Sequence, residues 1–210
     1  MRMPYLKMCS PDGESLECRI LTAALDLFVE RGFHNVSVHD IQKRAKVSIG
    51  SIYNHFGGKE GIAKSLYYHL VEEFEQMVND ILKEDLSYRE RCNRLIYQLL
   101  EYTETRRNII AFMLHARHLE FLPDEPPVCS SKPFKAIRNI VQEGMEAGEI
   151  RYGDPWVVAS TVFGGAIRLI HLRLDGIIKQ PITRFYDELI DCTWQGVLPK
   201  YGAEFREQAG

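Results

Sequence analysis

The chain has 210 residues with 26 Lys and Arg against 29 Asp and Glu, a net charge of −3, and 45% hydrophobic residues. This length suffices for one large or two small domains. We expect no apolar stretch that crosses a membrane, and the first 15 residues lack the apolar region of a secretory signal. These features exclude a secreted or membrane-spanning class and predict a cytoplasmic protein with a flexible arm at residues 1–14.

The charge is unevenly distributed. Through Leu66 the chain carries nine basic and seven acidic residues, a balance of +2, and the remainder carries 17 basic and 22 acidic residues, a balance of −5. This polarity favours an N-terminal part that faces nucleic acid and a larger acidic body.

The cysteines give no disulfide or metal signal. The five residues Cys9, Cys18, Cys92, Cys129 and Cys192 are odd in number and widely spaced, unlike a disulfide framework or a CxxC metal site. We expect reduced thiols that behave as small hydrophobic residues, with a thiol redox sensor as the alternative. We expect no cofactor and no metal.

Helical periodicity runs through almost every long segment. The first predicted helix ends at Gly32 in the left-handed conformation, and its buried face is formed by Ile20, Ala24, Leu27 and Phe28. Ser37 and Asp40 resemble a capping box that opens the second helix. Ser48 caps a third helix, and a long fourth helix begins at Lys59.

Five further helices are predicted beyond that long helix. They occupy residues 88–106, 107–120, 133–147, 155–174 and 181–197, and a proline-rich loop separates the second from the third. The sequence therefore predicts an all-α fold of about nine helices. We place a three-helix domain at residues 15–62 and a second helical domain at residues 63–210.

The segment from Ser37 to Lys59 has the features of a helix-turn-helix. Ala45 is the small residue that two crossing helices require, and Val47 is buried at the turn. The helix after the turn, which Ser48 caps, exposes side chains suited to DNA bases, phosphates or both. The predicted DNA-binding residues are Gln42, Lys43, Lys46, Ser48, Ile49, Ser51, Tyr53, Asn54, His55 and Lys59.

Residues 18–66 closely resemble the DNA-binding motif of the TetR family of bacterial transcriptional regulators. The match rests on the segment VHDIQKRAKVSIGSIYNHFGGKEGI, with its capped helix, Ala-x-Val turn and Lys-Glu start of the next helix. Two positions depart from the family pattern. Lys46 stands where glycine is common, so Lys46 either carries the strain of a left-handed backbone or adds a contact with phosphate. Gly58 replaces the Ser or Asn that usually caps the next helix.

The resemblance implies a dimeric regulator, most often a repressor, that binds a palindromic double-stranded DNA operator and is released by a small-molecule effector. The alternatives are a small-molecule enzyme and a DNA-binding protein without a ligand. No GxSxG elbow, P-loop, dinucleotide fingerprint or HExxH motif supports an enzyme.

A candidate effector pocket lies on the helices at residues 88–120. Apolar stripes with a few polar groups are typical of such pockets, and Arg106 favours an anionic ligand with lipophilic or aromatic character. The candidate lining residues are Leu99, Tyr102, Arg106, Phe112 and His115. These stripes also fit ordinary core packing, and His115 with His118 has the spacing of a metal pair but no nearby third ligand.

The last two helices carry more apolar residues than burial on one side needs, which favours a four-helix dimer interface. A monomer with a buried hairpin is the alternative. The predicted interface residues are Val158, Thr161, Val162, Gly165, Leu169, Leu172, Ile182, Phe185 and Leu189.

Overall fold

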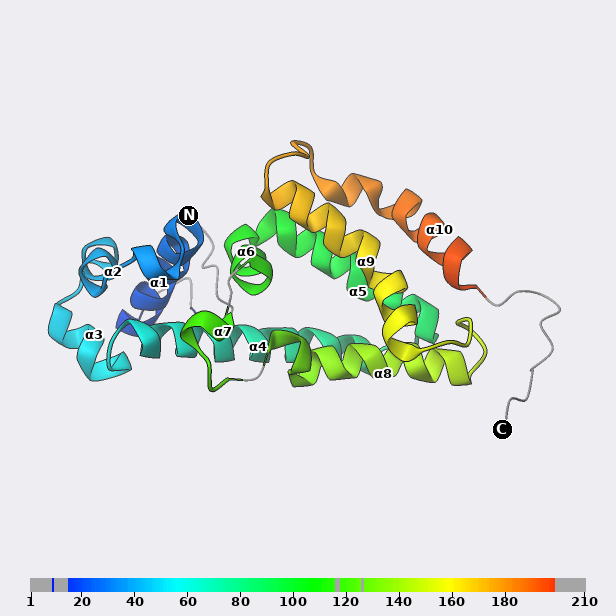
Figure 1. Ribbon diagram of the computed structural model, residues 1–210, viewed down its shortest axis with the longest axis horizontal. Helices are drawn as coiled ribbons and strands as arrows, with labels where there is room; N and C mark the ends of the chain where they lie inside the picture. The colour runs from blue at the N-terminus through cyan, green and yellow to red at the C-terminus, as the bar shows by residue number, and fades with distance from the viewer. Residues whose placement is uncertain (1–8, 10–14, 116–117, 126, 199–210) are drawn as a thin grey trace. The chain divides into compact units, whose positions relative to one another are not determined.

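The computed structural model of the chain describes residue 9 and residues 15–115, 118–125 and 127–198. These residues form ten α-helices and three short 3₁₀ helices and no strand, which confirms the all-α prediction (Figure 1). They divide into two compact units, one of residues 1–77 with 105–134 and the other of residues 78–104 with 135–210.

The first unit contains the N-terminal helices and the middle of the chain. Its elements are α1 (Leu16–Arg31), η1 (Phe33–Asn35), α2 (Val38–Ala45), α3 (Ile49–Phe56), most of α4 (Lys59–Lys83), α6 (Arg107–His115), α7 (His118–Phe121) and η2 (Val128–Ser130). The second unit contains α5 (Tyr88–Thr105), α8 (Lys132–Glu146), α9 (Pro155–Leu174), η3 (Ile182–Phe185) and α10 (Tyr186–Val197), with the end of α4.

Helix ends follow the predicted local signals, with three differences. Asp154 caps α9, because its carboxylate accepts a hydrogen bond from the Trp156 amide at 2.9 Å. Gly32 ends α1 with φ 77° and ψ 153°, a positive-φ conformation outside the left-handed helical region that we expected. The segment 107–120 forms two helices, and the last predicted helix begins with the 3₁₀ turn η3 before α10.

Half-buried polar contacts join the helices of the second unit. The Arg173 guanidinium donates to both carboxylate oxygens of Glu104, at 2.9 and 2.8 Å, and Glu104 also accepts from the Ile182 amide at 2.9 Å. Trp194 donates from its indole nitrogen to the Asn93 side chain at 2.7 Å. These contacts join α5 to α9, η3 and α10.

One pair of cysteines contradicts the expectation of reduced thiols. Cys9 and Cys18 form a disulfide that joins the arm to the first turn of α1. Their Cα atoms lie 5.7 Å apart, inside the range that a disulfide needs, and a spacing of nine residues gives no signal of this proximity. Cys92 is buried and Cys192 is exposed. Burial raises the pKa of the Cys92 thiol to about 12.

Helix α9 also corrects the expectation about apolar stretches. By length and composition alone it could cross a membrane, and only 22% of its apolar window is buried within the chain. Exposed apolar helices of this kind also form subunit interfaces, which are more apolar than the rest of a protein surface.

Candidate DNA-binding site and effector cavity

The turn between α2 and α3 is built around Lys46. Lys46 adopts φ 55° and ψ 50°, and it is the only non-glycine residue with positive φ among the described residues. The Arg19 guanidinium donates to the Ala45 carbonyl at 2.6 and 3.1 Å and to the Lys46 carbonyl at 2.6 Å. Arg19 therefore holds the strained turn from α1, a role that no local pattern indicated.

The amide of Gln42 also supports the turn. Its side-chain nitrogen donates to the Val47 carbonyl at 2.9 Å, and the side chain is half-buried. Gln42 therefore supports the turn, and its contact with DNA stays a prediction.

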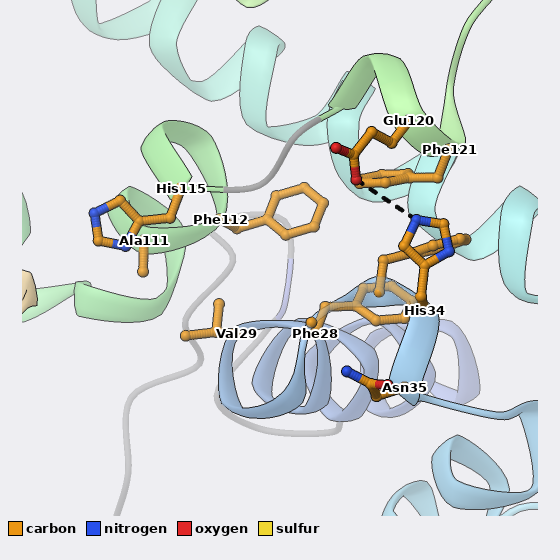
Figure 2. A pocket seen from close by; sticks show the side chains of 11 residues that line it. Phe28, Val29, His34, Asn35, Ala111, Phe112, His115, Glu120 and Phe121 are labelled. Atoms are coloured by element: carbon orange, nitrogen blue, oxygen red, sulfur yellow. Dashed lines mark ion pairs between the residues drawn. The ribbon is translucent and has the colours of Figure 1, made fainter.

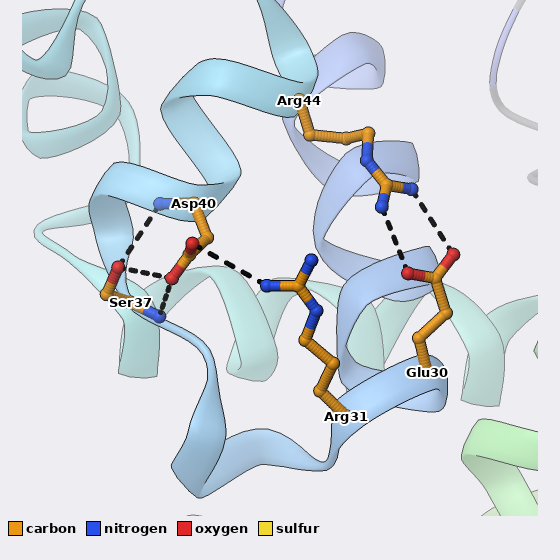
Figure 3. A network of polar contacts seen from close by, with 5 residues as sticks. All are labelled: Glu30, Arg31, Ser37, Asp40 and Arg44. Atoms are coloured by element: carbon orange, nitrogen blue, oxygen red, sulfur yellow. Dashed lines mark hydrogen bonds and ion pairs between the residues drawn. The ribbon is translucent and has the colours of Figure 1, made fainter.

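The start of α2 is fixed by the predicted capping box (Figure 3). Asp40 accepts from the Ser37 amide at 2.9 Å, and the Ser37 hydroxyl accepts from the Asp40 amide at 3.2 Å. The hydrogen bond from Ser37 holds the pKa of Asp40 below its usual value. Arg31 adds an ion pair to Asp40 at 3.6 Å, so the end of α1 and the start of α2 are joined.

A second ion pair joins α1 to α2 beside this box (Figure 3). Arg44 donates to both carboxylate oxygens of Glu30, at 3.0 and 3.3 Å, and this contact holds the pKa of Glu30 below its usual value. Both side chains are largely exposed, so the pair orients Arg44 toward α1 and adds little stability.

Helix α3 presents an exposed face of mixed chemistry. Ser48 caps the helix by accepting from the Ser51 amide at 3.0 Å, and the two hydroxyls lie 2.7 Å apart. Ile52 is fully buried against the core. The exposed predicted residues are Ser48, Ile49 (37% exposed), Tyr53 (54% exposed), Asn54 and His55, whereas Ser51 is half-buried.

The junction from α3 to α4 requires glycine at one position. A Cβ added at Gly61 would lie 1.6 Å from the Phe56 carbonyl oxygen. This oxygen belongs to the backbone, so it cannot move aside as a flexible side chain could. Gly57 ends α3 in the left-handed conformation, with φ 73°. Gly61 therefore lets the first turn of α4 approach the end of α3.

The predicted cations of the site differ in their surroundings. Lys43 and Lys46 are exposed, and their ammonium groups make no hydrogen bond or ion pair within the part of the chain that the structure describes. Lys59 is half-buried, donates to the Phe33 carbonyl at 3.0 Å, and places its ammonium 4.1 Å from the centre of the Phe33 ring. The Phe33 carbonyl takes one of the three donors of the Lys59 ammonium.

A cavity of about 300 Å³ lies within the first unit, between α1 with η1 and α6 with α7 (Figure 2). Phe112 and His115, two of the predicted effector-pocket residues, line it. The other three, Leu99, Tyr102 and Arg106, do not line this cavity. The residues that sequence analysis missed come from α1, η1 and α7, since periodicity within one helix does not show which other helix faces it.

Arg106 has a structural partner instead of a ligand. Its guanidinium forms an ion pair at 2.9 Å with Glu73 of α4, whose side chain is 5% exposed. The buried carboxylate compensates the charge of Arg106, so the expectation of an anionic ligand loses its basis. The side chain of His118, the second member of the predicted metal pair, lies outside the described residues. Those residues contain no group of three His, Cys, Asp or Glu side chains that could hold a metal.

The predicted interface residues divide by burial. Val158, Val162 and Ile182 are buried within the chain, so we remove them from the predicted interface. A Cβ at Gly165 would lie 2.9 Å from a methyl group of Leu189, so Gly165 allows close packing of α9 on α10 within the chain. Leu169, Leu172, Phe185 and Leu189 are half-buried, and Thr161 is exposed.

An outward stripe of α9 contains Thr161 and four residues that were not predicted. Val157 is 62% exposed, and Ser160, Thr161, Gly164 and Arg168 follow it at helical spacing, all exposed. A Cβ added at Gly164 would meet no atom within 4 Å. Periodicity did not indicate the other four positions, because a helix that is apolar on several sides has the same pattern on faces that pack within a subunit and on faces that remain open.

Comparison with known proteins agrees with this architecture. Residues 20–66 match the profile of bacterial regulatory proteins of the tetR family, and residues 67–198 match the tetracyclin repressor-like C-terminal domain. The two profiles meet between residues 66 and 67, whereas we placed the domain boundary after residue 62.

Three relatives illustrate the similarity. The fatty acid metabolism regulator protein of Bacillus subtilis (strain 168) is 27% identical over 150 residues, which cover 70% of this chain and 77% of the relative. The crystal structure of FadR from Bacillus subtilis in complex with stearoyl-CoA has a TM-score of 0.70 and 23% identity, covering 85% of this chain and 97% of the other. The SmeT–triclosan complex has a TM-score of 0.68 and 19% identity, covering 89% and 93%.

The two profiles together match most of the chain, the first from α1 to the start of α4 and the second from there to residue 198. The chain belongs to the TetR family of bacterial transcriptional regulators and is a helix-turn-helix DNA-binding protein.

Proposed function

We propose that this regulator is a cytoplasmic repressor that binds a palindromic operator as a homodimer and is released by a small molecule. The exposed face of α3, held by an anchored turn, is the observation that carries the proposal. Asn54 can exchange hydrogen bonds with base edges and Ile49 can contact a thymine methyl group, while Tyr53 and His55 suit phosphate oxygens. Lys43 and Lys46 add positive charge beside this face.

The dimer is supported by the exposed apolar surface of α9. Its outward stripe contains Val157, Thr161 and Gly164, and small residues of this kind permit close helix approach. Homodimers are typical of this family. A two-fold interface between copies of α9 and α10 would bury the stripe and form a four-helix arrangement.

Release by an effector is supported by the relatives. FadR of Bacillus subtilis has been crystallised with stearoyl-CoA, and SmeT has been crystallised with triclosan. An effector can release DNA only if it binds better to a conformation that fits the operator poorly. Two recognition helices that enter successive major grooves must be separated by about 34 Å, so a change in this separation is sufficient.

The test is selection of bound duplexes from a random DNA pool at physiological salt with the full chain. We expect a palindrome with half-sites about one helical turn apart, and specific binding that weakens with added salt. Ile49→Glu is a matched control, because it places a negative charge on the reading face and should recover no consensus. Recovery of unrelated sequences with the wild-type chain would contradict the proposed function.

A further inference from the structure

A disulfide joins the start of the chain to the helix that supports the helix-turn-helix. Cys9 and Cys18 form this bond, and each residue is 3% exposed. Cys18 is the third residue of α1 and lies in its first turn. A bond between residues nine positions apart removes conformations from the unfolded chain. The disulfide therefore favours the arrangement in which Cys9 is held at the first turn of α1.

The compartment of the protein makes this bond unusual. A transcriptional regulator acts where the DNA is, and we have proposed that this one is cytoplasmic. Low-molecular-weight thiols keep most cytoplasmic cysteines reduced, and the disulfides that form there are usually transient and either catalytic or redox-sensing. Two cysteines held at bonding distance can change reversibly between a dithiol and a disulfide by exchange with such thiols. The disulfide therefore indicates a redox-sensitive pair.

The first turn of α1 has few hydrogen bonds of its own. The Ser15 hydroxyl caps the helix by accepting from the Cys18 amide at 3.1 Å. The Arg19 amide donates the first backbone hydrogen bond of the helix, to the Ser15 carbonyl at 3.0 Å. Helix ends fray because their outer turns lack the hydrogen bonds of the interior. A covalent bond at Cys18 opposes this fraying, so it holds the backbone of Arg19 in the helix.

Arg19 connects this first turn to the DNA-reading segment. Its guanidinium donates to the Ala45 carbonyl at 2.6 and 3.1 Å and to the Lys46 carbonyl at 2.6 Å. Lys46 has a left-handed backbone, which costs a non-glycine residue free energy, so the turn depends on contacts of this kind. When the first turn of α1 frays, these contacts weaken, and the turn that sets the position of α3 is less firmly held.

We propose that Cys9 and Cys18 form a redox-sensitive pair whose disulfide form binds the operator more tightly than its dithiol form. In the reduction, two molecules of a low-molecular-weight thiol transfer two electrons and two protons to the pair. The bond between the two cysteines breaks, two protein thiols form, and the reductant becomes its own disulfide. Because both residues are buried, exchange requires a local opening at α1. The proposal rests on the proposed function, which supplies the cytoplasmic setting and the operator.

The first experiment measures the thiol–disulfide equilibrium of the full chain in mixtures of reduced and oxidised glutathione. Iodoacetamide would trap the free thiols, and peptide mass spectrometry would give the labelled fraction of Cys9 and Cys18. We expect the same transition from disulfide to dithiol when the equilibrium is approached from either side. A pair that stays oxidised in excess reduced glutathione would be a structural bond only and would overturn the proposal. A pair that never oxidises would overturn it as well.

The second experiment compares the affinity of the two forms for the selected operator. Cys192→Ser is the background for both forms, because Cys192 is exposed and could itself react with glutathione. We expect reduction to weaken operator binding at least about fivefold, the lower end of the usual coupling between two sites. Operator should in turn shift the glutathione equilibrium toward the disulfide, because coupling is reciprocal. Equal operator affinity of the two forms would overturn the regulatory role of the pair.

The third experiment locates the response with substitutions. Cys9→Ser removes the bond without changing α1, so it should bind operator like the reduced chain and ignore glutathione. Arg19→Met should bind operator more weakly and lose most of the difference between the two forms, whereas Arg44→Met should keep that difference. A response that persists in Cys9→Ser would overturn the assignment to this pair, and one that persists in Arg19→Met would overturn the connection through Arg19.

Failure of the proposed function is a separate result. DNA selection with the wild-type chain would then recover no operator, while the glutathione equilibrium of Cys9 and Cys18 can still be measured without DNA.

Discussion

The helix-turn-helix and the α9–α10 hairpin differ in how far their side chains find partners within the chain. In the helix-turn-helix, the turn carbonyls of Ala45 and Lys46 are bound by Arg19, and the start of α2 is closed by its own capping box. In the hairpin, Val157 and its neighbours on α9 remain exposed although the helix is strongly apolar. The first region has its polar groups paired within one chain, whereas the second leaves exposed the stripe of α9 that the proposed dimer would cover.

This comparison explains which substitutions should affect folding and which should affect assembly. A tightly packed region has little room for added atoms, so even one methyl group matters there. A face that a partner covers in the proposed dimer should instead lose that partner when a charge is introduced, because the centres of interfaces are depleted of charged residues.

Gly61→Ala is expected to have the largest effect. The added methyl group would overlap the Phe56 carbonyl, 1.6 Å away, and the free energy of unfolding should fall by at least about 3 kcal/mol. Gly50→Ala in α3 is the matched control, because its added methyl group meets only the Ser48 hydroxyl, at 3.9 Å, and alanine favours a helix by about 1 kcal/mol. Thermal unfolding followed by circular dichroism would compare them, and equal midpoints would contradict the close approach of α3 and α4.

Val157→Glu tests the open side of the comparison. A buried carboxylate in the proposed interface should raise the dimer dissociation constant at least a hundredfold and give a monomer in light scattering. Ile49→Glu makes the same change on the face of α3 and should leave the dimer intact while it removes operator binding. A Val157→Glu chain that remains a dimer would place the interface elsewhere.

Arg19→Met tests whether the turn depends on long-range hydrogen bonds. Methionine retains the apolar stem and removes the three contacts with the turn carbonyls, so we expect a loss of roughly 2 kcal/mol in stability. Arg44→Met removes the exposed pair with Glu30 and should cost less than about 1 kcal/mol. Denaturant unfolding would measure both, and a smaller loss for Arg19→Met than for Arg44→Met would contradict the anchoring role.

Tyr53→Ala is expected to leave stability unchanged, because the side chain is 54% exposed. Affinity should fall roughly fivefold for specific and unrelated duplexes alike, because a phosphate contact carries no sequence information. Asn54→Ala should instead change the preferred base at one position of each half-site. Filter binding against the selected operator and its single-base variants would separate the two effects. A changed base preference in Tyr53→Ala would reverse the two assignments.

The last prediction concerns the reactivity of the cysteines and involves no substitution. Cys92, with its pKa raised by burial to about 12, remains a protonated thiol even at pH 9 and should resist iodoacetamide in the folded protein. Cys192 is exposed and should react. Cys9 and Cys18 should be labelled only after reduction, as peptide mass spectrometry would show. Labelling of Cys18 without a reductant would contradict the disulfide.

The sequence by itself determined the all-α class, most helix ends and the left-handed turn at Lys46. Capping by Ser37 and Ser48 spans three residues, and a helix brings residues three apart together whatever surrounds it. The family pattern added the motif that contains the reading helix. These features could be predicted because each depends on spacing within one segment.

Only the tertiary structure decided which side chains the helices bring together. Arg19 reaches the turn from 26 residues away, Lys59 reaches Phe33 over the same separation, and Glu73 of α4 neutralises Arg106. The cavity between α1 and α6 and the open stripe of α9 likewise depend on which helix faces pack within the chain. Periodicity identifies an apolar face but does not identify the element that covers it, since hydrophobic burial has no direction of its own.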